Sequence, residues 1–330
     1  MGREMLKSVW SVCKRILQTL LVVLLLLVAA WMYFGYSPIP QEPMLSAAPR
    51  EAKLLVDGRE RTYFEYIPAQ LPTLAPLLVV LHGSVMNGAQ MRITTGFEFD
   101  QMADSKGFVV FYPSGYRGHW NDCRKLPNFS AKREQIDDMG FIRALVRQAK
   151  EQYHIDPHRV YLVGYSNGGH MAFRVRAEAP QLVAGVAVAA ASPTIAEDSV
   201  CNPRGEKSPV LMVNGTSDML NAYDGGERLL WGIAPRGRVM SSVEAAAWFA
   251  ERNGITATPV EESLPDLDED DSTRVVRRSW SLDKYPPVVL YTVEGGGHVI
   301  PQSAYRFPRM YGRTTGDLDF PTTVVGFFGL

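Results

Sequence analysis

The chain has 330 residues, of which 46% are hydrophobic, and its 34 basic residues nearly balance its 35 acidic ones. This composition is ordinary for a globular protein, and the length suits a single large α/β domain. A net charge near zero argues against the electrostatic attraction that a nucleic-acid partner requires. We therefore expect a neutral small molecule as the ligand.

The N-terminus carries an uncharged apolar run at residues 16–36, preceded by a basic flank at residues 1–15. A helix needs about 20 apolar residues to cross a bilayer, and aromatic residues cluster at the far end of the run, as at a membrane interface. The sequence predicts an anchor in the lipid bilayer, with the rest of the chain outside the cytoplasm, periplasmic or extracellular. The alternative is a signal peptide cleaved near residues 28–30, which would release a secreted protein.

A stretch rich in Pro, Ser and Ala, residues 37–52, is predicted to be a linker to one folded domain at residues 53–330. That domain opens with two β-prone stretches around Asp57-Gly58, which predict an antiparallel hairpin. Short runs follow that are apolar throughout, each before a turn with Gly: LLVVL, FVVFY, RVYLV, VAGVAVA, PVLMV and VVLYTV. Such runs are typical of parallel strands buried between two layers of helices.

Helical patterns lie between some of these runs. Within residues 137–154, an apolar stripe at i, i+3, i+4, i+7 and i+11 that follows an Asp cap predicts a helix. A capping box from Ser241 to Glu244 starts another, which ends at Gly254, and PTTVVGFFGL is a terminal helix. The acidic stretch 261–272 lacks the Gly and Glu of a calcium loop, so it is predicted to be a surface loop. Together these elements predict an α/β fold with a mostly parallel central sheet and helices on both faces.

The sequence G-Y-S-N-G, residues 164–168, stands between a predicted buried strand and a predicted helix. This context is that of a nucleophile elbow, in which a strained turn lifts a serine hydroxyl above the sheet and glycines allow strand and helix to approach. Ser166 is therefore the candidate nucleophile. The alternative is one serine in a glycine-rich connection.

A serine nucleophile needs a base and an acid that orients the base, in the chain order Ser, acid, His. Asp218 follows the strand PVLMV, and His298 follows the strand VVLYTV. Three glycines before His298 predict a flexible loop that carries the imidazole over the sheet edge. The alternatives are Asp224 or a purely structural turn for Asp218, and an ordinary loop histidine for His298.

A tetrahedral intermediate also needs backbone N–H donors, one from the residue after the nucleophile and one from an earlier strand-to-helix loop. Asn167 and Ser84, the latter in LHGS, are the candidates for this oxyanion hole. A turn without catalytic duty is the alternative for LHGS. The spacing of His, Cys and carboxylate residues indicates no metal, and no cofactor is expected.

The three cysteines are Cys13, Cys123 and Cys201. Cys13 lies on the predicted cytoplasmic flank, whereas the other two would be exported into an oxidising compartment, where they can pair. Such a disulfide would close a long loop and add about 4 kcal/mol of stability in the entropic model. Two separate thiols remain the alternative.

These residues stand within a longer set of motifs: LHGS, FYPSG, HWNDC, DDMGFIRALV, YHIDPHRVYLVGYSNGGHMAFRV, VNGTSD, GGGH and RFPRMYGRTTGDLDF. In this order they resemble the polyhydroxybutyrate depolymerase-like and feruloyl esterase-like family of secreted serine esterases. The resemblance runs from residue 53 to the end. It implies an α/β-hydrolase fold and ester hydrolysis by Ser166, Asp218 and His298. It also implies that Trp120 and Asn121 lie near the substrate pocket.

The sequence thus predicts an exported serine esterase that acts on small or oligomeric esters of hydroxyalkanoate, feruloyl or acetyl type. Members of the family that this sequence resembles often carry other residues at the positions of Ser84 and Val299, so we expect the substrate pocket to differ from theirs. A serine peptidase of prolyl-oligopeptidase type and a catalytically silent hydrolase-fold binding protein are the alternatives. Sequence does not predict the oligomeric state.

Overall fold

The computed structural model describes residues 2–202, 207–230 and 234–330 of the chain. It divides into two compact units: Met1–Pro38 with Pro308–Met310, and Ile39–Phe307 with Tyr311–Leu330. The second unit holds all the strands and the residues predicted to do chemistry. We call it the catalytic unit.

The first unit is built on one helix, α1 (Gly2–Phe34), which is long and apolar enough to cross a membrane. At 1.5 Å per residue, its 33 residues measure about 50 Å. The helix takes in the predicted basic flank as well as most of the apolar run, because Met, Leu, Lys and Arg in the flank all favour helix. The roles of anchor and signal peptide remain predictions.

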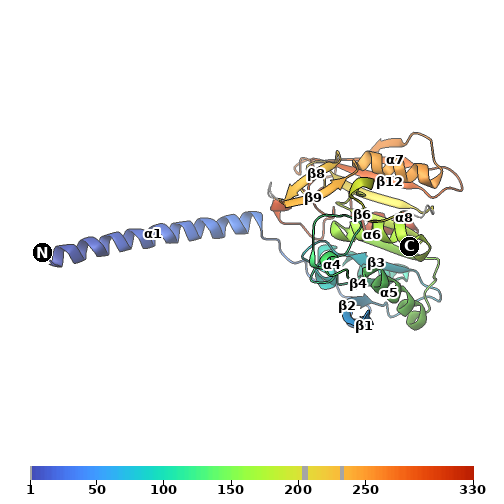
Figure 1. Ribbon diagram of the computed structural model, residues 1–330, viewed down its shortest axis with the longest axis horizontal. Helices are drawn as coiled ribbons and strands as arrows, with labels where there is room; N and C mark the ends of the chain where they lie inside the picture. The colour runs from blue at the N-terminus through green and yellow to red at the C-terminus, as the bar shows by residue number, and fades with distance from the viewer. Residues whose placement is uncertain (1, 203–206, 231–233) are drawn as a thin grey trace. The chain divides into compact units, whose positions relative to one another are not determined.

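The catalytic unit is organised around one ten-stranded sheet, in the order β1-β2-β4-β3-β5-β6-β7-β12-β11-β10 (Figure 1). Its strands are β1 (Arg50–Val56), β2 (Arg59–Tyr66), β3 (Leu77–Leu81), β4 (Val109–Pro113), β5 (Val160–Tyr165), β6 (Gly185–Ala189), β7 (Val210–Gly215), β10 (Val260–Ser263), β11 (Arg274–Trp280) and β12 (Val288–Glu294). The six strands from β4 to β12 in this order pair in parallel, and two antiparallel strands flank them at each edge.

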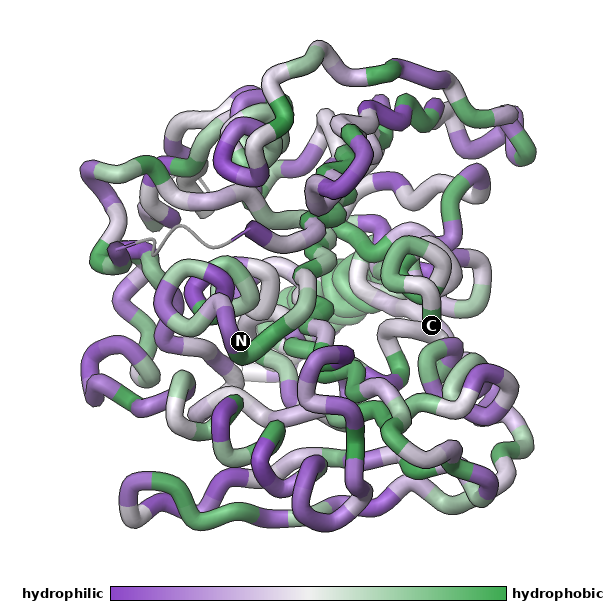
Figure 2. The backbone as a smooth tube through the Cα atoms, turned by 90° about the vertical axis from the view of Figure 1, so that its right-hand side faces the viewer, coloured by the Kyte–Doolittle hydropathy of each residue, from purple (hydrophilic) through white to green (hydrophobic). Residues whose placement is uncertain are grey.

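Helices cover both faces of the sheet, as the apolar central strands require. On one face, α5 (Asp138–Tyr153), α6 (Asn167–Glu178) and α7 (Ser242–Asn253) pack on the strands; on the other, α2 (Gly88–Thr94), α3 (Glu98–Lys106) and α8 (Phe320–Phe328) do so. Figure 2 colours the backbone by hydropathy, and many of the loops toward the edge of the picture are purple, which marks hydrophilic residues. Shorter helical turns are α4 (Ser130–Arg133), η1 (Pro180–Leu182), η2 (Ala196–Asp198) and η3 (Arg309–Tyr311).

Each predicted parallel strand and each predicted helix of the catalytic unit is present, so the α/β prediction is confirmed. Two boundaries were wrong. The predicted linker, residues 37–52, extends three residues too far because β1 starts at Arg50, and Ser46 already donates from its N–H to Asp104 at 2.8 Å. The acidic stretch begins as edge strand β10, whose Glu261 pairs with Arg278 of β11 at 2.7 Å. The hairpin of β8 (Gly226–Leu230) and β9 (Ala234–Val239) was not predicted.

Candidate active site

Ser166 occupies a sharp turn between β5 and α6 at the carboxyl edge of the sheet. Its backbone angles, φ 53° and ψ −117°, lie where side-chain-bearing residues rarely go. The turn is fixed at both ends: the Ser166 N–H donates to the Ala189 carbonyl at 2.9 Å, and its carbonyl accepts from the His170 N–H at 3.0 Å. This is the geometry of a nucleophile elbow, and its strain persists because the surrounding strands and helix determine the backbone.

The two glycines of G-Y-S-N-G are required by close packing rather than by flexibility. A Cβ on Gly164 would lie 2.4 Å from the carbonyl oxygen of Gly168, and one on Gly168 would lie 2.3 Å from that of Leu81. Both distances are far below any van der Waals contact. Only glycine therefore lets β5, α6 and the end of β3 meet at this point.

His298 lies between Ser166 and Asp218, and all three side chains are buried. Its Nε2 is 2.8 Å from Ser166 Oγ, and its Nδ1 is 2.7 Å from Asp218 Oδ2. An ionised carboxylate can only accept, so Nδ1–H donates to Asp218 and Nε2 is left to accept the serine proton. Asp218 is itself held in place, since its Oδ1 accepts the N–H groups of Leu220 and Asn221 at 2.7 and 2.8 Å.

The structure brings His298 to Asp218 and leaves the alternative acid, Asp224, exposed on the surface. The three glycines before His298 do not form the flexible loop that the sequence suggested. A Cβ on Gly297 would lie 2.1 Å from the Tyr311 carbonyl oxygen, and one on Gly296 would lie 2.5 Å from the Val293 side chain. The His298 N–H also donates to the Tyr311 carbonyl at 2.7 Å. The glycines thus allow tight packing that holds the imidazole in place.

The LHGS loop lies directly against the elbow, because a Cβ on Gly83 would be 2.8 Å from the Tyr165 ring and 3.4 Å from Ser166 Cβ. Asn167 is the first residue of α6, so its N–H has no partner within the helix. Within the described part of the chain, no protein acceptor is recorded for the Ser84 N–H either, and the Ser84 hydroxyl is buried without a partner. Asn167 and Ser84 therefore both adjoin residues of the elbow, and their role as oxyanion donors remains a prediction.

His82, whose role the sequence did not suggest, shapes this loop. Its Nε2 accepts the Gly115 N–H at 2.8 Å, so the proton is on Nδ1, which donates to the Gly83 carbonyl at 2.6 Å. Complete burial lowers the pKa of His82 to about 4, so the ring is neutral at physiological pH. By fixing the Gly83 carbonyl, His82 fixes the peptide that carries the Ser84 N–H.

Trp120 and Asn121 are both buried, and Trp120 contacts the LHGS loop. Trp120 donates from Nε1 to the His82 carbonyl at 2.9 Å and from its N–H to Asn167 Oδ1 at 2.8 Å. Asn121 donates from its N–H to Asp138 at 2.7 Å and from its amide to the Ile136 carbonyl at 3.1 Å. These contacts support the site from below, and contact of either residue with substrate remains a prediction.

Asp122 extends this support and was not found from the sequence. Its carboxylate accepts from the Asn167 amide at 2.6 Å and from the Arg124 guanidinium at 2.6 and 3.1 Å. Burial opposes its ionisation, but the charge and hydrogen bonds of Arg124 outweigh that effect and lower the pKa of Asp122 below its usual value. The neighbouring Cys123 forms a disulfide with Cys201, with 5.3 Å between their Cα atoms, and ties this segment to the loop after β6.

Arg236 of β9 adds a positive charge near the triad. Its Nε is buried and has no hydrogen-bond partner among the residues that the structure describes. Burial, followed by the charge of Arg124, lowers the pKa of Arg236 to about 10, and the carboxylates of Asp122 and Asp218 oppose this shift.

Of the other histidines, His170 is buried in the first turn of α6, and burial lowers its pKa well below the usual value. In residues 2–202, 207–230 and 234–330, no cluster of side chains could hold a metal ion.

An elbow at the carboxyl edge of a mixed sheet, with helices on both faces, places the chain among the α/β hydrolases. The fold is similar to that of an acetyl xylan esterase from Aspergillus awamori, with a TM-score of 0.53 at 15% sequence identity. That alignment covers 85% of this chain and 99% of the other.

The chain belongs to the esterase PHB depolymerase family, whose sequence model matches residues 62–233. It is 29% identical over 303 residues to a putative esterase, NocK, of Nocardia uniformis subsp. tsuyamanensis, which covers 88% of this chain and 86% of that protein. It is 26% identical over 257 residues to poly(3-hydroxyalkanoate) depolymerase C of Paucimonas lemoignei, covering 72% of this chain and 58% of that one. The protein is therefore a carboxylic ester hydrolase.

Proposed function

We propose that the protein is an exported serine esterase that works through an acyl-enzyme on Ser166. The observation that carries the proposal is the continuous hydrogen-bond chain from Ser166 Oγ through His298 to Asp218, at 2.8 and 2.7 Å. A serine hydroxyl is a poor nucleophile until a base takes its proton. The hydrogen bond from Nδ1 to Asp218 leaves Nε2 of His298 free to act as that base.

In the first half-reaction Ser166 Oγ attacks the ester carbonyl while its proton passes to Nε2 of His298. Asp218 stabilises the imidazolium that forms, and His298 then gives the proton to the departing alcohol oxygen. In the second half-reaction a water molecule attacks the acyl carbonyl while His298 takes its proton. His298 then returns that proton to Ser166 Oγ as the bond between the acyl group and Ser166 breaks, which releases the carboxylic acid. Atoms and charges balance over the two steps, and no cofactor is consumed.

The negative charge on the carbonyl oxygen is stabilised in this mechanism by the N–H groups of Asn167 and Ser84. Both belong to rigid backbone: Asn167 to the first turn of α6, and Ser84 to the loop that His82 and Trp120 hold. Donors that are fixed in advance need no reorganisation as charge develops, which is why such groups contribute about 100- to 1,000-fold to the rate.

The substrate class that we propose is small or oligomeric esters of hydroxyalkanoate, feruloyl or acetyl type. Relatives of this chain include depolymerases of poly(3-hydroxyalkanoate) and proteins named feruloyl esterase B and acetylxylan esterase. A comparison of hydroxybutyrate oligomers, methyl ferulate, acetylated xylo-oligosaccharides and p-nitrophenyl acetate would rank these classes. If the protein hydrolysed none of these four substrates, the proposed substrate class would be wrong.

The proposed nucleophile can be tested by labelling the full-length protein with a fluorophosphonate probe. A serine activated by His298 should react in minutes and retain the label through denaturation, whereas the Ser166→Ala variant should take up none. Peptide mapping should place the adduct on Ser166. A protein that stays unlabelled while correctly folded would instead be the catalytically silent scaffold, and a labelled protein that cleaves peptide amides but not esters would be a peptidase.

Export is supported by two independent features, the apolar helix α1 and the disulfide between Cys123 and Cys201. Disulfides of this kind persist in oxidising compartments and are rare in the cytosol. We expect the protein in the membrane fraction of the cells that express it, with its catalytic unit open to added protease. A mature N-terminus at or after Trp31 would reject the anchor, and a protease-protected catalytic unit in intact cells would reject export.

A further inference from the structure

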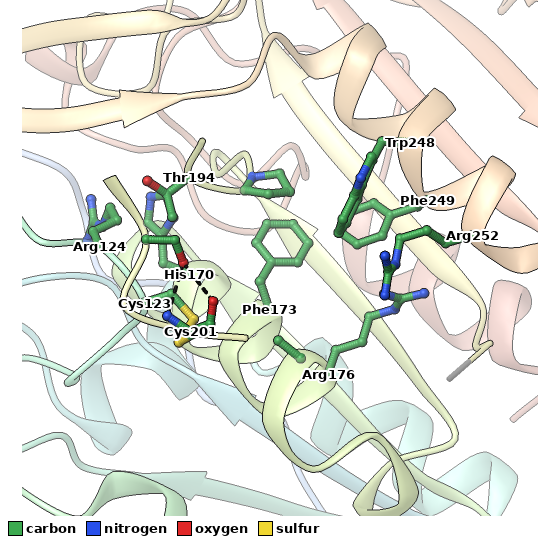
Figure 3. Close-up of a pocket in the computed structure, with 13 residues that line it drawn as sticks. Cys123, Arg124, His170, Phe173, Arg176, Thr194, Cys201, Trp248, Phe249 and Arg252 are labelled. Atoms are coloured by element: carbon green, nitrogen blue, oxygen red, sulfur yellow. Dashed lines mark hydrogen bonds between the residues drawn. A yellow bond between two sulfur atoms is a disulfide. The ribbon is translucent and has the colours of Figure 1, made fainter. Parts of the chain in front are cut away.

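A hollow in the catalytic unit lies between α6, α7 and the loop that follows β6 (Figure 3). Helix α6 lines it with Phe173 and Arg176, and α7 lines it with Trp248, Phe249 and Arg252. The disulfide between Cys123 and Cys201 also borders the hollow. None of the three triad residues lines it. Arg176 follows Ser166 by ten positions along α6, a rise of about 15 Å.

Two guanidinium groups meet at one end of this hollow. That of Arg176 lies over the Phe249 ring at 4.5 Å from its centroid, and that of Arg252 lies over the Trp248 ring at 4.8 Å. Figure 3 shows the two groups next to each other, and the charge of Arg252 acts on Arg176. The two arginines are thus held side by side by the aromatic residues of α7.

Neither arginine has an acidic partner in the described part of the chain, residues 2–202, 207–230 and 234–330. Arg176 is only 6% exposed, and the acceptors that it reaches are neutral: Ser208 Oγ at 3.0 Å and Asn253 Oδ1 at 3.3 Å. Burial, followed by the charge of Arg252, lowers the pKa of Arg176 to about 10. The Arg176 guanidinium therefore stays charged at neutral pH, and an anion between the two guanidinium groups would offset the repulsion that Arg252 exerts on it.

Between α6 and α7 the wall of the hollow is aromatic, whereas Arg124, His170, Thr194 and Ser199 also line the hollow. Phe173 is 8% exposed and Phe249 is 3% exposed, and their rings stack at 5.4 Å with 27° between planes. Trp248 meets Phe249 edge to face at 4.9 Å. A flat ring fits such surroundings by offset or edge-to-face contacts, and ligand pockets typically combine an apolar wall with a few charged groups of this kind.

We propose that this hollow is a second binding site, separate from the triad, for a small aromatic carboxylate. The carboxylate would bridge the guanidinium groups of Arg176 and Arg252, with one oxygen to each. The ring would lie against Phe173, Trp248 and Phe249. Charge-assisted hydrogen bonds to the two arginines would fix its orientation, because guanidinium groups match the planar geometry of a carboxylate.

The test uses the full-length protein in detergent and three probes followed by calorimetry: cinnamate, neutral cinnamamide and acetate. The Ser166→Ala variant serves as the host, so that catalysis adds no heat. Cinnamate should bind, whereas cinnamamide lacks the charge and acetate lacks the ring, so each should bind about tenfold more weakly or worse. Equal binding of cinnamate and cinnamamide, or no binding of cinnamate, would overturn the proposal.

Arg252→Gln in the same host locates the site. Arg252 is chosen because Arg176 also links α6 to Ser208 and Asn253, so that its loss would disturb the fold. Arg252→Gln should weaken cinnamate binding by about tenfold, whereas Arg143→Gln, which removes an exposed arginine of α5, should leave it unchanged. In protein with Ser166 intact, Arg252→Gln should keep full hydrolysis of p-nitrophenyl acetate. Unchanged cinnamate binding in Arg252→Gln, or an equal loss in Arg143→Gln, would refute this location.

Discussion

Alanine in place of Ser166, and alanine in place of His298, should each lower kcat for p-nitrophenyl butyrate by roughly 10⁴- to 10⁶-fold. In the proposed mechanism, loss of Ser166 removes the nucleophile that forms the acyl-enzyme. Without His298 the hydroxyl keeps its proton, since the hydrogen bond of 2.8 Å to Nε2 is its route to a base. Stopped assays at high enzyme concentration, with thermal unfolding of each variant, would measure both effects.

The double variant Ser166→Ala/His298→Ala should be no slower than either single variant. The two groups act in one proton transfer, so removing the second after the first removes nothing more. The activity that remains should come from the oxyanion donors and substrate binding alone. A double variant whose loss equals the product of the two single losses would show that the residues act independently, which contradicts the proposed mechanism.

Matched controls are available on the surface of the catalytic unit. Ser105 is an exposed serine of α3 and His158 is an exposed histidine after α5, so Ser105→Ala and His158→Ala repeat the chemistry of the substitutions away from the site. Both should keep kcat and stability close to those of the unchanged protein. Only a loss confined to Ser166 and His298 supports their assignment.

The sequence predicted the parts of the fold that depend on local pattern. Strands that are apolar on both faces, such as β3 and β5, and the capping box of α7 are visible without tertiary information, and the structure confirms them. The placing of Ser166, Asp218 and His298 also followed from pattern, since each comes after the carboxyl end of a strand. Parallel strands bring their carboxyl ends to one edge of a sheet, whatever the loops do.

Other features depend on contacts between distant segments, and no local pattern carries them. Asp122 holds Asn167 across 45 residues, and Trp120 reaches His82 across 38. The edge strand β10 reads V-E-E-S and has four exposed residues, so it lacks the apolar signal from which strands are predicted. It forms because its partner β11 offers arginines opposite its glutamates. The three glycines before His298 were interpreted as a flexible loop. Their packing against Tyr311, which excludes a side chain at Gly297, is a contact between distant segments and has no local pattern.

Gly168→Ala should lower kcat by about 100-fold without changing any triad residue. The new Cβ would lie 2.3 Å from the Leu81 carbonyl oxygen, whereas ordinary contact begins at 3.4 Å, so α6 and the end of β3 must separate by about 1 Å. Asn167 lies on one side of this contact and the LHGS loop on the other. The substitution would therefore pull the two oxyanion donors apart, and an error of about 1 Å in such a site costs on the order of 100-fold in rate. Overpacking should also lower the free energy of unfolding by about 1–3 kcal/mol.

The same substitution at Gly326 of α8 is the matched control. A Cβ there meets nothing within 4 Å, so Gly326→Ala should keep full activity and stabilise the protein by up to about 1 kcal/mol, because alanine favours helix. The kcat of the folded fraction and the rate of fluorophosphonate labelling separate a displaced oxyanion hole from simple unfolding. If Gly168→Ala left kcat and the unfolding temperature unchanged, the backbone of the elbow would accommodate a side chain at this position. The fixed placement of Asn167 and Ser84 would then not explain the rate of hydrolysis.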